Sequence, residues 1–396
     1  DADAAAVARR LNGVQAQVMS FAELAIGLRA PGVTAADVAA ALEHERSLVK
    51  TWTVRGTLHL LPAEDLPLWA AVLQATRPLR LPPAWLSYHG VSADDVHAVL
   101  NAIPRALDGR CLTREALARE AARISGRPQL EAVLKGGWGS LLKPVAYRGL
   151  LCFGPNEGRN VTFVRPEQWL GRWESVDPDQ ALDEILRRYL DAYGPAAPAD
   201  FAHWFGLRPP EARRRFERLA PELVPVDVEG RRAWLTRAGA ASLAEVAAGP
   251  SGGNLTADAA AGPSAAVGTA GAAGALAGAA TAAAAETVRL VPGFDQYVIG
   301  ALAHVEYLLP GPYKARISRP AGWISPALLV DGAIAGTWRH ERRGHRLLVA
   351  IVPFAPLPQT VRTAAEAEAE RIAAWLGTPA EVRWESEASA VPEVRS

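Results

Sequence analysis

The chain has 396 residues, of which 49% are hydrophobic and 21% are charged. This composition supports roughly two to four folded domains with hydrophobic cores and excludes a largely disordered protein. The 42 basic and 42 acidic residues cancel, which excludes an overall field that would draw the protein onto a polyanion. Any binding to a charged partner must therefore depend on local clusters, and most of the available cations are arginines.

The cysteine content and the lengths of the apolar segments limit where the protein can be located and which cofactors it can hold. The sequence contains no unbroken apolar span of membrane-helix length and does not begin with a signal-peptide pattern, so we expect a cytoplasmic protein with no membrane partner. Cys111 and Cys152 are too few for a disulfide framework or a cysteine zinc site, and the eight histidines show no ligand spacing. We therefore expect no metal and no redox cofactor.

Two amides one residue apart, Gln15 and Gln17, interrupt an apolar run near the N-terminus. On a regular helix these side chains would lie roughly 200° apart, whereas an extended segment could direct both toward one ligand. Gly13 makes such an irregular segment plausible. An amide pair can hold a water molecule or a polar substrate, but it cannot act as a strong base. The motif predicts a positioning site, and the alternative is a pair of ordinary helix-surface glutamines.

The first segment, residues 1–90, combines helices with a strand. Thr34 is placed to cap a helix that runs through Leu42, and a strand is predicted from Thr51 to Leu61. Strict alternation in this strand predicts one apolar face and one wetter face. The wetter face would line an active site or would simply be a solvated surface; it carries Thr51, Thr53, Arg55, Thr57 and His59.

The second segment, residues 91–177, has the order helix, helix, helix, hairpin that is typical of a winged helix. Ser92 and Thr113 are placed to cap the first two helices. The third helix is predicted over Leu130–Val145, and the strands are predicted around Tyr147–Phe153 and Asn160–Val164.

The third segment, residues 178–246, repeats this order. Its third helix carries Arg213 and Arg214, which are candidates for DNA contact in a major groove, with a solvated arginine face as the alternative. The first predicted helix runs from Pro178 through Ala192, the second is opened by Gly194–Asp200 and ends at Trp204, and the third spans Pro210–Leu219. The predicted strands are Leu223–Val228 and Arg232–Leu235.

Residues 247–286 are almost entirely Ala, Gly, Ser, Pro and Thr, and this composition predicts a linker or a disordered insertion. The final segment, residues 287–396, is predicted to be rich in β-structure. Asp331-Gly332 predicts a two-residue turn between Ala327–Val330 and Ala333–Trp338. A basic hairpin tip follows, then a strand at Leu347–Val352 and a helix near Val361–Trp375. The hairpin would enter a DNA groove or would be a turn kept soluble by its charges, which are Arg339, Arg342, Arg343 and Arg346.

Taken together, these segments resemble the bacterial winged-helix DNA glycosylases of the YcaQ and AlkZ types. In that family the YcaQ-like members carry Gln-x-Asp at the catalytic position, whereas the azinomycin self-resistance type carries Gln-x-Gln, which Gln15-Ala16-Gln17 matches. The resemblance runs through nearly the whole chain outside the linker. It rests on Leu11–Gln17, Val54–His59, Arg188–Pro195, Asp200–Trp204, Val291–Tyr297, Arg319–Trp323 and Leu329–Gly332.

The resemblance implies an α+β protein in which three tandem winged helices form a C-shaped clamp on DNA, followed by a β-rich segment. It implies a monofunctional glycosylase without cofactors that hydrolyses the N-glycosidic bond of N7-alkylguanine, unhooks interstrand crosslinks and confers resistance to an alkylating natural product. We expect a nucleoid-associated monomer whose partner is double-stranded DNA with alkylated or crosslinked guanine.

The chemistry suits two amides, because an N7-alkylguanine is already cationic and leaves without a strong acid. The remaining work is to place a water molecule and to stabilise a positively charged sugar. Asp295 is the carboxylate predicted to help, with a turn-capping role as its alternative. Two rival functions remain open: a non-catalytic winged-helix transcriptional regulator and a protein-interaction scaffold.

Overall fold

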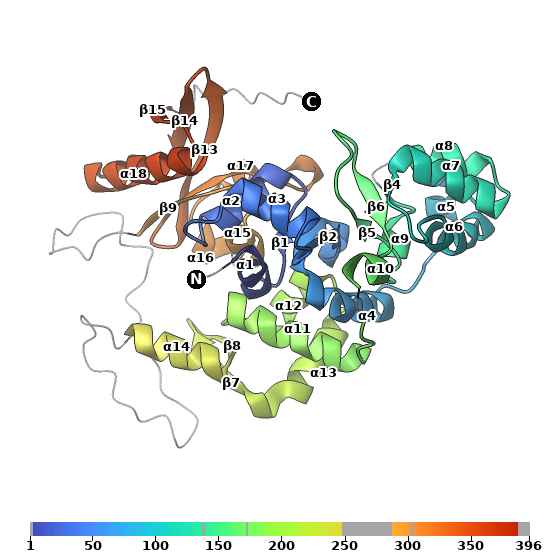
Figure 1. Ribbon diagram of the computed structural model, residues 1–396. Coiled ribbons are helices and arrows are strands. Elements are labelled where there is room, and N and C mark those ends of the chain that lie inside the picture. Colours follow the sequence, from blue (N-terminus) through green and yellow to red (C-terminus); the bar gives the residue numbers. More distant parts are fainter. Residues whose placement is uncertain (1–2, 137–138, 172, 248–286, 302–304, 387–396) are drawn as a thin grey trace. The chain divides into compact units, whose positions relative to one another are not determined.

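The computed structural model describes residues 3–136, 139–171, 173–247, 287–301 and 305–386 (Figure 1). It is an α+β structure in which helices alternate with several small sheets. The chain divides into two compact units, Asp1–Ile185 with Pro292–Gln296 and Leu186–Val291 with Tyr297–Ser396. The linker predicted at 247–286 lies outside the described residues except for its first residue. Among the described helices, none is long and apolar enough to cross a membrane.

The N-terminal segment has winged-helix topology, in which a short first strand joins the later hairpin to give the sheet order β1-β3-β2. Thr34 caps α3 as predicted, through a capping box with Asp37. Asn12 (φ 53°) and Gly13 (φ 101°) turn the chain out of α1 into β1. The elements are α1 (Ala4–Arg10), β1 (Val14–Gln15), α2 (Met19–Gly27), α3 (Ala35–Glu43), β2 (Leu48–Trp52) and β3 (Leu58–Pro62).

The strand predicted over Thr51–Leu61 is wrong as a single strand. A tight turn at Val54–Gly56 divides it into β2 and β3, which pair antiparallel. The physical reason is that Arg55 (φ 54°) and Gly56 (φ 73°) both have left-handed backbone, which reverses the chain. The alternating pattern continues across the turn and therefore hides it.

The second segment repeats the same topology, with the sheet order β4-β6-β5. Ser92 and Thr113 cap its first two helices as predicted. The helix predicted over Leu130–Val145 is interrupted, since α8 ends at Lys135 and Gly139 has a left-handed backbone (φ 75°). The elements are α6 (Ala93–Ala106), β4 (Leu112–Thr113), α7 (Arg114–Ser125), α8 (Gln129–Lys135), α9 (Lys143–Ala146), β5 (Cys152–Phe153) and β6 (Thr162–Val164).

Three further helices flank these elements, and the sequence reasoning did not predict them. Two follow β3 at the end of the first segment, and the third follows β6 in the second segment. They are α4 (Leu66–Thr76), α5 (Pro83–His89) and α10 (Pro166–Leu170). The core of the second segment includes Trp52 from β2, so the two segments share apolar packing within the first unit.

The third segment confirms the predicted helices and hairpin to within a few residues. An isolated bridge between Ala196 and Trp234 takes the place of the short first strand, so the winged-helix order occurs a third time. Its core is aromatic and includes Tyr189, Phe201 and Phe216. The elements are α11 (Pro178–Tyr193), α12 (Pro198–Phe205), α13 (Pro209–Leu219), β7 (Leu223–Val228), β8 (Arg231–Thr236) and α14 (Arg237–Ala247).

The C-terminal part is built on a five-stranded sheet of order β15-β14-β13-β12-β9, against which α18 packs (Figure 1). Asp331 (φ 48°) and Gly332 (φ 83°) form the predicted turn between β12 and β13. The elements are β9 (Val288–Val291), α15 (Gln296–Ala301), α16 (Val305–Leu308), α17 (Lys314–Ile317), β10 (Ser318–Arg319), β11 (Trp323–Ile324), β12 (Ala327–Val330), β13 (Ala333–Arg343), β14 (Arg346–Pro353), α18 (Gln359–Trp375) and β15 (Ala380–Trp384).

Candidate active site

The two glutamines lie between α1 and α2 and belong to neither helix, since Gln15 ends β1 and Gln17 lies in the bend that follows it. Gln15 belongs to β1 and pairs with His59, and the next residue, Ala16, donates its backbone N–H to the Leu58 carbonyl at 2.7 Å. The Gln15 side chain is buried, whereas that of Gln17 is exposed, and the Gln17 Oε1 accepts a hydrogen bond from the Leu58 backbone N–H at 3.3 Å. Gln15 pairs with His59, and Gln17 is bonded to the adjacent Leu58, so both amides lie beside β3 and can contact one ligand.

Gln15 begins a row of polar side chains that crosses the sheet. It pairs with His59, which pairs in turn with Thr51, and directly paired residues present their side chains on the same face. All three are at least 95% buried, so the prediction that this is the wetter face of the strand is wrong. Val14 and Leu60 on the opposite face are equally buried. Both faces of this small sheet are therefore covered.

The imidazole of His59 is held neutral in one tautomer. Its Nδ1 lies 3.2 Å from the Thr57 carbonyl oxygen, which can only accept, so Nδ1 carries the proton and Nε2 is left as an acceptor. Burial, together with the nearby charge of Arg55, lowers the pKa of His59 to about 3. The row therefore holds an amide, a neutral imidazole and the Thr51 hydroxyl, for which the described part of the chain supplies no hydrogen-bond partner.

The depressed pKa of His59 predicts acid sensitivity. An unfolded chain protonates this histidine near pH 6.5, whereas the folded chain does so only near pH 3, so stability falls as the pH drops through that window. The loss reaches at most about 1.4 kcal/mol per pH unit. His59→Gln should remove this component and flatten the pH dependence of the urea midpoint between pH 7 and 4. His44→Gln, which removes an exposed histidine, is the control; equal slopes for the two variants would contradict the assignment.

The turn at Arg55 and Gly56 lies directly before this row. A left-handed arginine is strained by on the order of 1 kcal/mol and persists only where its surroundings enforce it, as often happens at functional sites. The Thr57 hydroxyl donates to the Val54 carbonyl at 3.1 Å, so it stabilises the turn. Arg55 is partly exposed. Of the residues predicted to lie on the polar face of this strand, Thr51 and His59 lie in the row, and Arg55 and Thr57 belong to the adjacent turn.

Asp295 lies in a buried ion pair with Arg29. Its two carboxylate oxygens each accept a hydrogen bond from Arg29 at 2.8 Å, and its side chain is fully buried. Phe294 and Phe21 have ring centroids 6.4 Å apart beside this pair. Arg29 follows α2, the helix that leaves the glutamine segment. This geometry favours a structural role for Asp295 in holding α2.

Comparisons with known proteins decide the family. Residues 8–375 match the sequence model of the family described as "DNA glycosylase AlkZ-like". The chain belongs to this AlkZ-like DNA glycosylase family. It is 36% identical over 376 residues to the "Interstrand DNA cross-link repair glycosylase" of Streptomyces sahachiroi, covering 93% of this chain and 89% of the relative. The solved structure of Streptomyces sahachiroi DNA glycosylase AlkZ matches with a TM-score of 0.79 and 34% identity, over 97% of this chain and 94% of that one.

The arginines predicted to contact DNA lie in the second unit of this AlkZ-like protein. Arg339, Arg342 and Arg343 belong to β13 itself, which is longer than predicted, and Arg346 begins β14. Three of these four are engaged: Arg339 pairs with Glu385 through two bonds of 2.8 and 2.9 Å, Arg343 pairs with Glu341, and Arg342 donates to the Leu376 carbonyl. On α13, Arg213 and Arg214 are exposed, and Arg214 pairs with Glu211.

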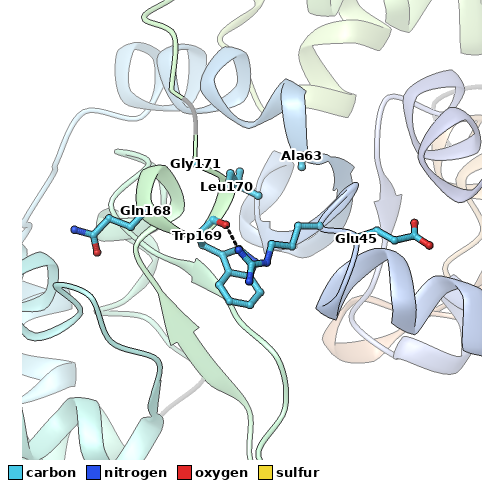
Figure 2. Close-up of a pocket in the computed structure, with 7 residues that line it drawn as sticks. Glu45, Ala63, Gln168, Trp169, Leu170 and Gly171 are labelled. Atoms are coloured by element: carbon cyan, nitrogen blue, oxygen red, sulfur yellow. Dashed lines mark hydrogen bonds between the residues drawn. The ribbon is translucent and has the colours of Figure 1, made fainter.

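A cavity of about 250 Å³ in the first unit is lined by neither Gln15 nor Gln17 (Figure 2). The guanidinium of Arg46 lies 3.7 Å over the Trp169 ring, and its Nη1 donates to the Trp169 carbonyl at 2.9 Å. These two contacts join Arg46 of the first segment to Trp169 of the second. Its lining residues are Glu45, Arg46, Ala63, Gln168, Trp169, Leu170 and Gly171.

The sequence reasoning missed three residues that the structure places around the site. Arg29 pairs with Asp295, and Lys143 and Tyr147 approach the Arg55-Gly56 turn. No local pattern distinguishes Arg29 from the other arginines. Lys143 carried one usable signal, since it is one of only four lysines in an arginine-rich chain.

Proposed function

We propose that this glycosylase hydrolyses the N-glycosidic bond of N7-alkylguanine in double-stranded DNA and unhooks interstrand crosslinks as a monomer. The observation that carries the proposal is the non-helical Gln15-Ala16-Gln17 segment along β3, which places one buried and one exposed amide close to the neutral imidazole of His59. The name of the Streptomyces sahachiroi relative, which refers to crosslink repair, supports the choice of lesion.

The proposed step needs neither a strong acid nor a strong base. The bond between C1′ and N9 breaks, its electron pair goes to the cationic base, and the base leaves as neutral N7-alkylguanine. Gln17 and Gln15 hold a water molecule through donated and accepted hydrogen bonds. The water oxygen attacks the positively charged sugar at C1′, and its proton passes to solvent. The neutral Nε2 of His59 is suited to orient the Gln15 amide, because it can accept a hydrogen bond from an amide N–H.

The decisive experiment separates an enzyme from a regulator built on the same winged helices. The protein is incubated with duplex DNA that carries one N7-methylguanine, and with a duplex that carries a guanine-to-guanine N7 crosslink. We expect released methylguanine, an abasic site and separated strands. Retention of both bases, with only a shift of the duplex in a binding assay, would support the regulator.

The hairpin of β13 and β14 is proposed to bind DNA through its arginines. Changing Arg339, Arg342, Arg343 and Arg346 together to alanine should weaken duplex binding and lower the salt slope by up to about 0.9 per lost phosphate contact. Because the pairs of Arg339 with Glu385 and Arg343 with Glu341 already engage two of the four, we expect the measured slope change to fall short of four contacts. Fluorescence anisotropy across a salt series measures this.

The control for the hairpin is Arg371→Ala, which removes an exposed arginine of α18 that is paired with Glu368. Crosslink unhooking should suffer more than release of methylguanine, since the hairpin would act on DNA beyond the base. Unchanged binding and unhooking by the quadruple variant at every salt concentration would show that the hairpin does not contact DNA. Arg213 and Arg214 would then be the next pair to change.

A further inference from the structure

A second group of polar side chains meets the turn that precedes the His59 row. At Gly56 an added Cβ would lie 3.0 Å from the Tyr147 Oη and 3.7 Å from the Lys143 Nζ. The backbone of this turn is therefore open to close approach because residue 56 is glycine, and its positive φ of 73° also favours glycine. The hydroxyl and the ammonium converge on it from α9 and the residue that follows it.

Several positively charged side chains lie close to the Arg55-Gly56 turn. Arg55 belongs to the turn, and the guanidinium of Arg77 lies 5.6 Å from the centre of the Tyr147 ring. Within the described residues, Lys143 forms no ion pair with a carboxylate. Burial lowers the pKa of Lys143 and that of Arg77, and it raises the pKa of Tyr147. Partial burial of a cation without a carboxylate is unfavourable, and an anion supplied from outside would relieve it.

We propose that Lys143 Nζ and Tyr147 Oη, at the Arg55-Gly56 turn, bind one phosphate of the DNA backbone beside the lesion. Lysine binds phosphate as a point charge, and a tyrosine hydroxyl donates to a phosphate oxygen. Neither residue lies in the hairpin or on α13, where the arginines suggested DNA contact. The site would therefore be an additional phosphate contact within the unit that holds the glutamines.

The position of this phosphate site relative to Gln17 suggests how it would contribute to the reaction. Gly56 is two residues from Leu58, whose backbone N–H bonds to the Gln17 amide, and two residues span at most about 7 Å. A phosphate held at the turn would thus belong to the lesion nucleotide or to a close neighbour. Fixing that phosphate would hold C1′ against the two amides, which is how positioning accelerates a reaction. This purpose rests on the proposed function of Gln15 and Gln17, whereas phosphate binding itself does not.

Two variants test the proposal with little risk to folding. Lys143→Gln removes the charge but keeps the length of most of the side chain, and Tyr147→Phe keeps the ring against Arg77. The matched control is Lys135→Gln, which removes a lysine from α8 whose ammonium pairs with Glu131. Lys143→Gln should weaken duplex binding and lower the salt slope by about 0.9, the value for one phosphate. Tyr147→Phe should weaken binding with little change in slope.

A more specific test uses duplexes in which one phosphate at a time is replaced by an uncharged methylphosphonate. At one position near the lesion, the substitution should weaken binding by the parent enzyme but not by Lys143→Gln, whereas Lys135→Gln should behave like the parent. Absence of any such position would overturn the proposal. If inorganic phosphate instead raises the melting temperature of the parent but not of Lys143→Gln, the site takes free phosphate and the DNA assignment is overturned. Binding is measured without base release, so failure of the glutamine mechanism remains distinguishable.

Discussion

Gln17→Ala is expected to slow base release by about 10²–10³-fold while leaving duplex affinity almost unchanged, and Gln15→Ala is expected to do the same. The rate falls because each substitution removes one fixed group that holds the attacking water or stabilises a developing charge. Affinity should persist because it comes mainly from phosphate contacts elsewhere. Single-turnover release of N7-methylguanine, measured beside anisotropy on the same duplex, separates the two quantities.

Two further variants sharpen this test. Gln74→Ala removes an exposed glutamine of α4 and should release base at the parent's rate. Gln17→Asp should retain activity on methylguanine if the position stabilises positive charge on the sugar. Parental rates in both Gln15→Ala and Gln17→Ala would contradict the proposed mechanism. The search for the reacting groups would then move to Arg55 and His59.

Arg29→Met is expected to destabilise the protein by about 3–5 kcal/mol, since it leaves the Asp295 carboxylate buried without the guanidinium that holds both of its oxygens. Asp295→Asn should cost less, because an amide can still accept one of the two bonds. Replacing both residues by leucine should recover part of the loss, because a buried ion pair exchanged for apolar side chains is often neutral. Urea unfolding at pH 7 measures all three.

The comparison for this pair is Arg123→Met, which breaks an exposed ion pair with Glu120 on α7 and should hardly change the urea midpoint. If Arg29→Met costs no more than Arg123→Met, the Asp295 pair does not stabilise the first unit. If it destabilises the protein and also slows base release at temperatures where the chain remains folded, the pair positions α2 and the glutamine segment before it.

Much of the fold was predictable because helix ends and turns carry local chemistry. The hydroxyls of Thr34, Ser92 and Thr113 accept from backbone N–H groups three residues ahead, and Asp331-Gly332 supplies the two left-handed residues of a tight turn. The turn at Arg55 escaped prediction for a specific reason. Arginine does not favour a left-handed backbone by itself, so tertiary surroundings impose that conformation and no local pattern reports it.

Only part of the site was predictable from the sequence, and there is a physical reason why some residues could be predicted and others could not. Residue type and spacing single out Gln15 and Gln17, because two amides in an apolar run are unusual. Burial of His59 depends on a sheet whose strands are distant in sequence, so an alternating pattern reads it as solvent-facing. The partnership of Arg29 with Asp295 joins residues that are 266 positions apart. Such a pair cannot be predicted from patterns within a short stretch of sequence.

That long separation also has a consequence for synthesis on the ribosome. The first unit ends at Ile185 except for Pro292–Gln296, which is made about a hundred residues later. At about 5–20 residues per second, translation needs on the order of 5–20 s to deliver this segment, and the Arg29 and Asp295 pair cannot form during that interval. A message truncated before the codon for Asp295 would therefore yield a polypeptide that contains both glutamines but cannot complete the unit around them.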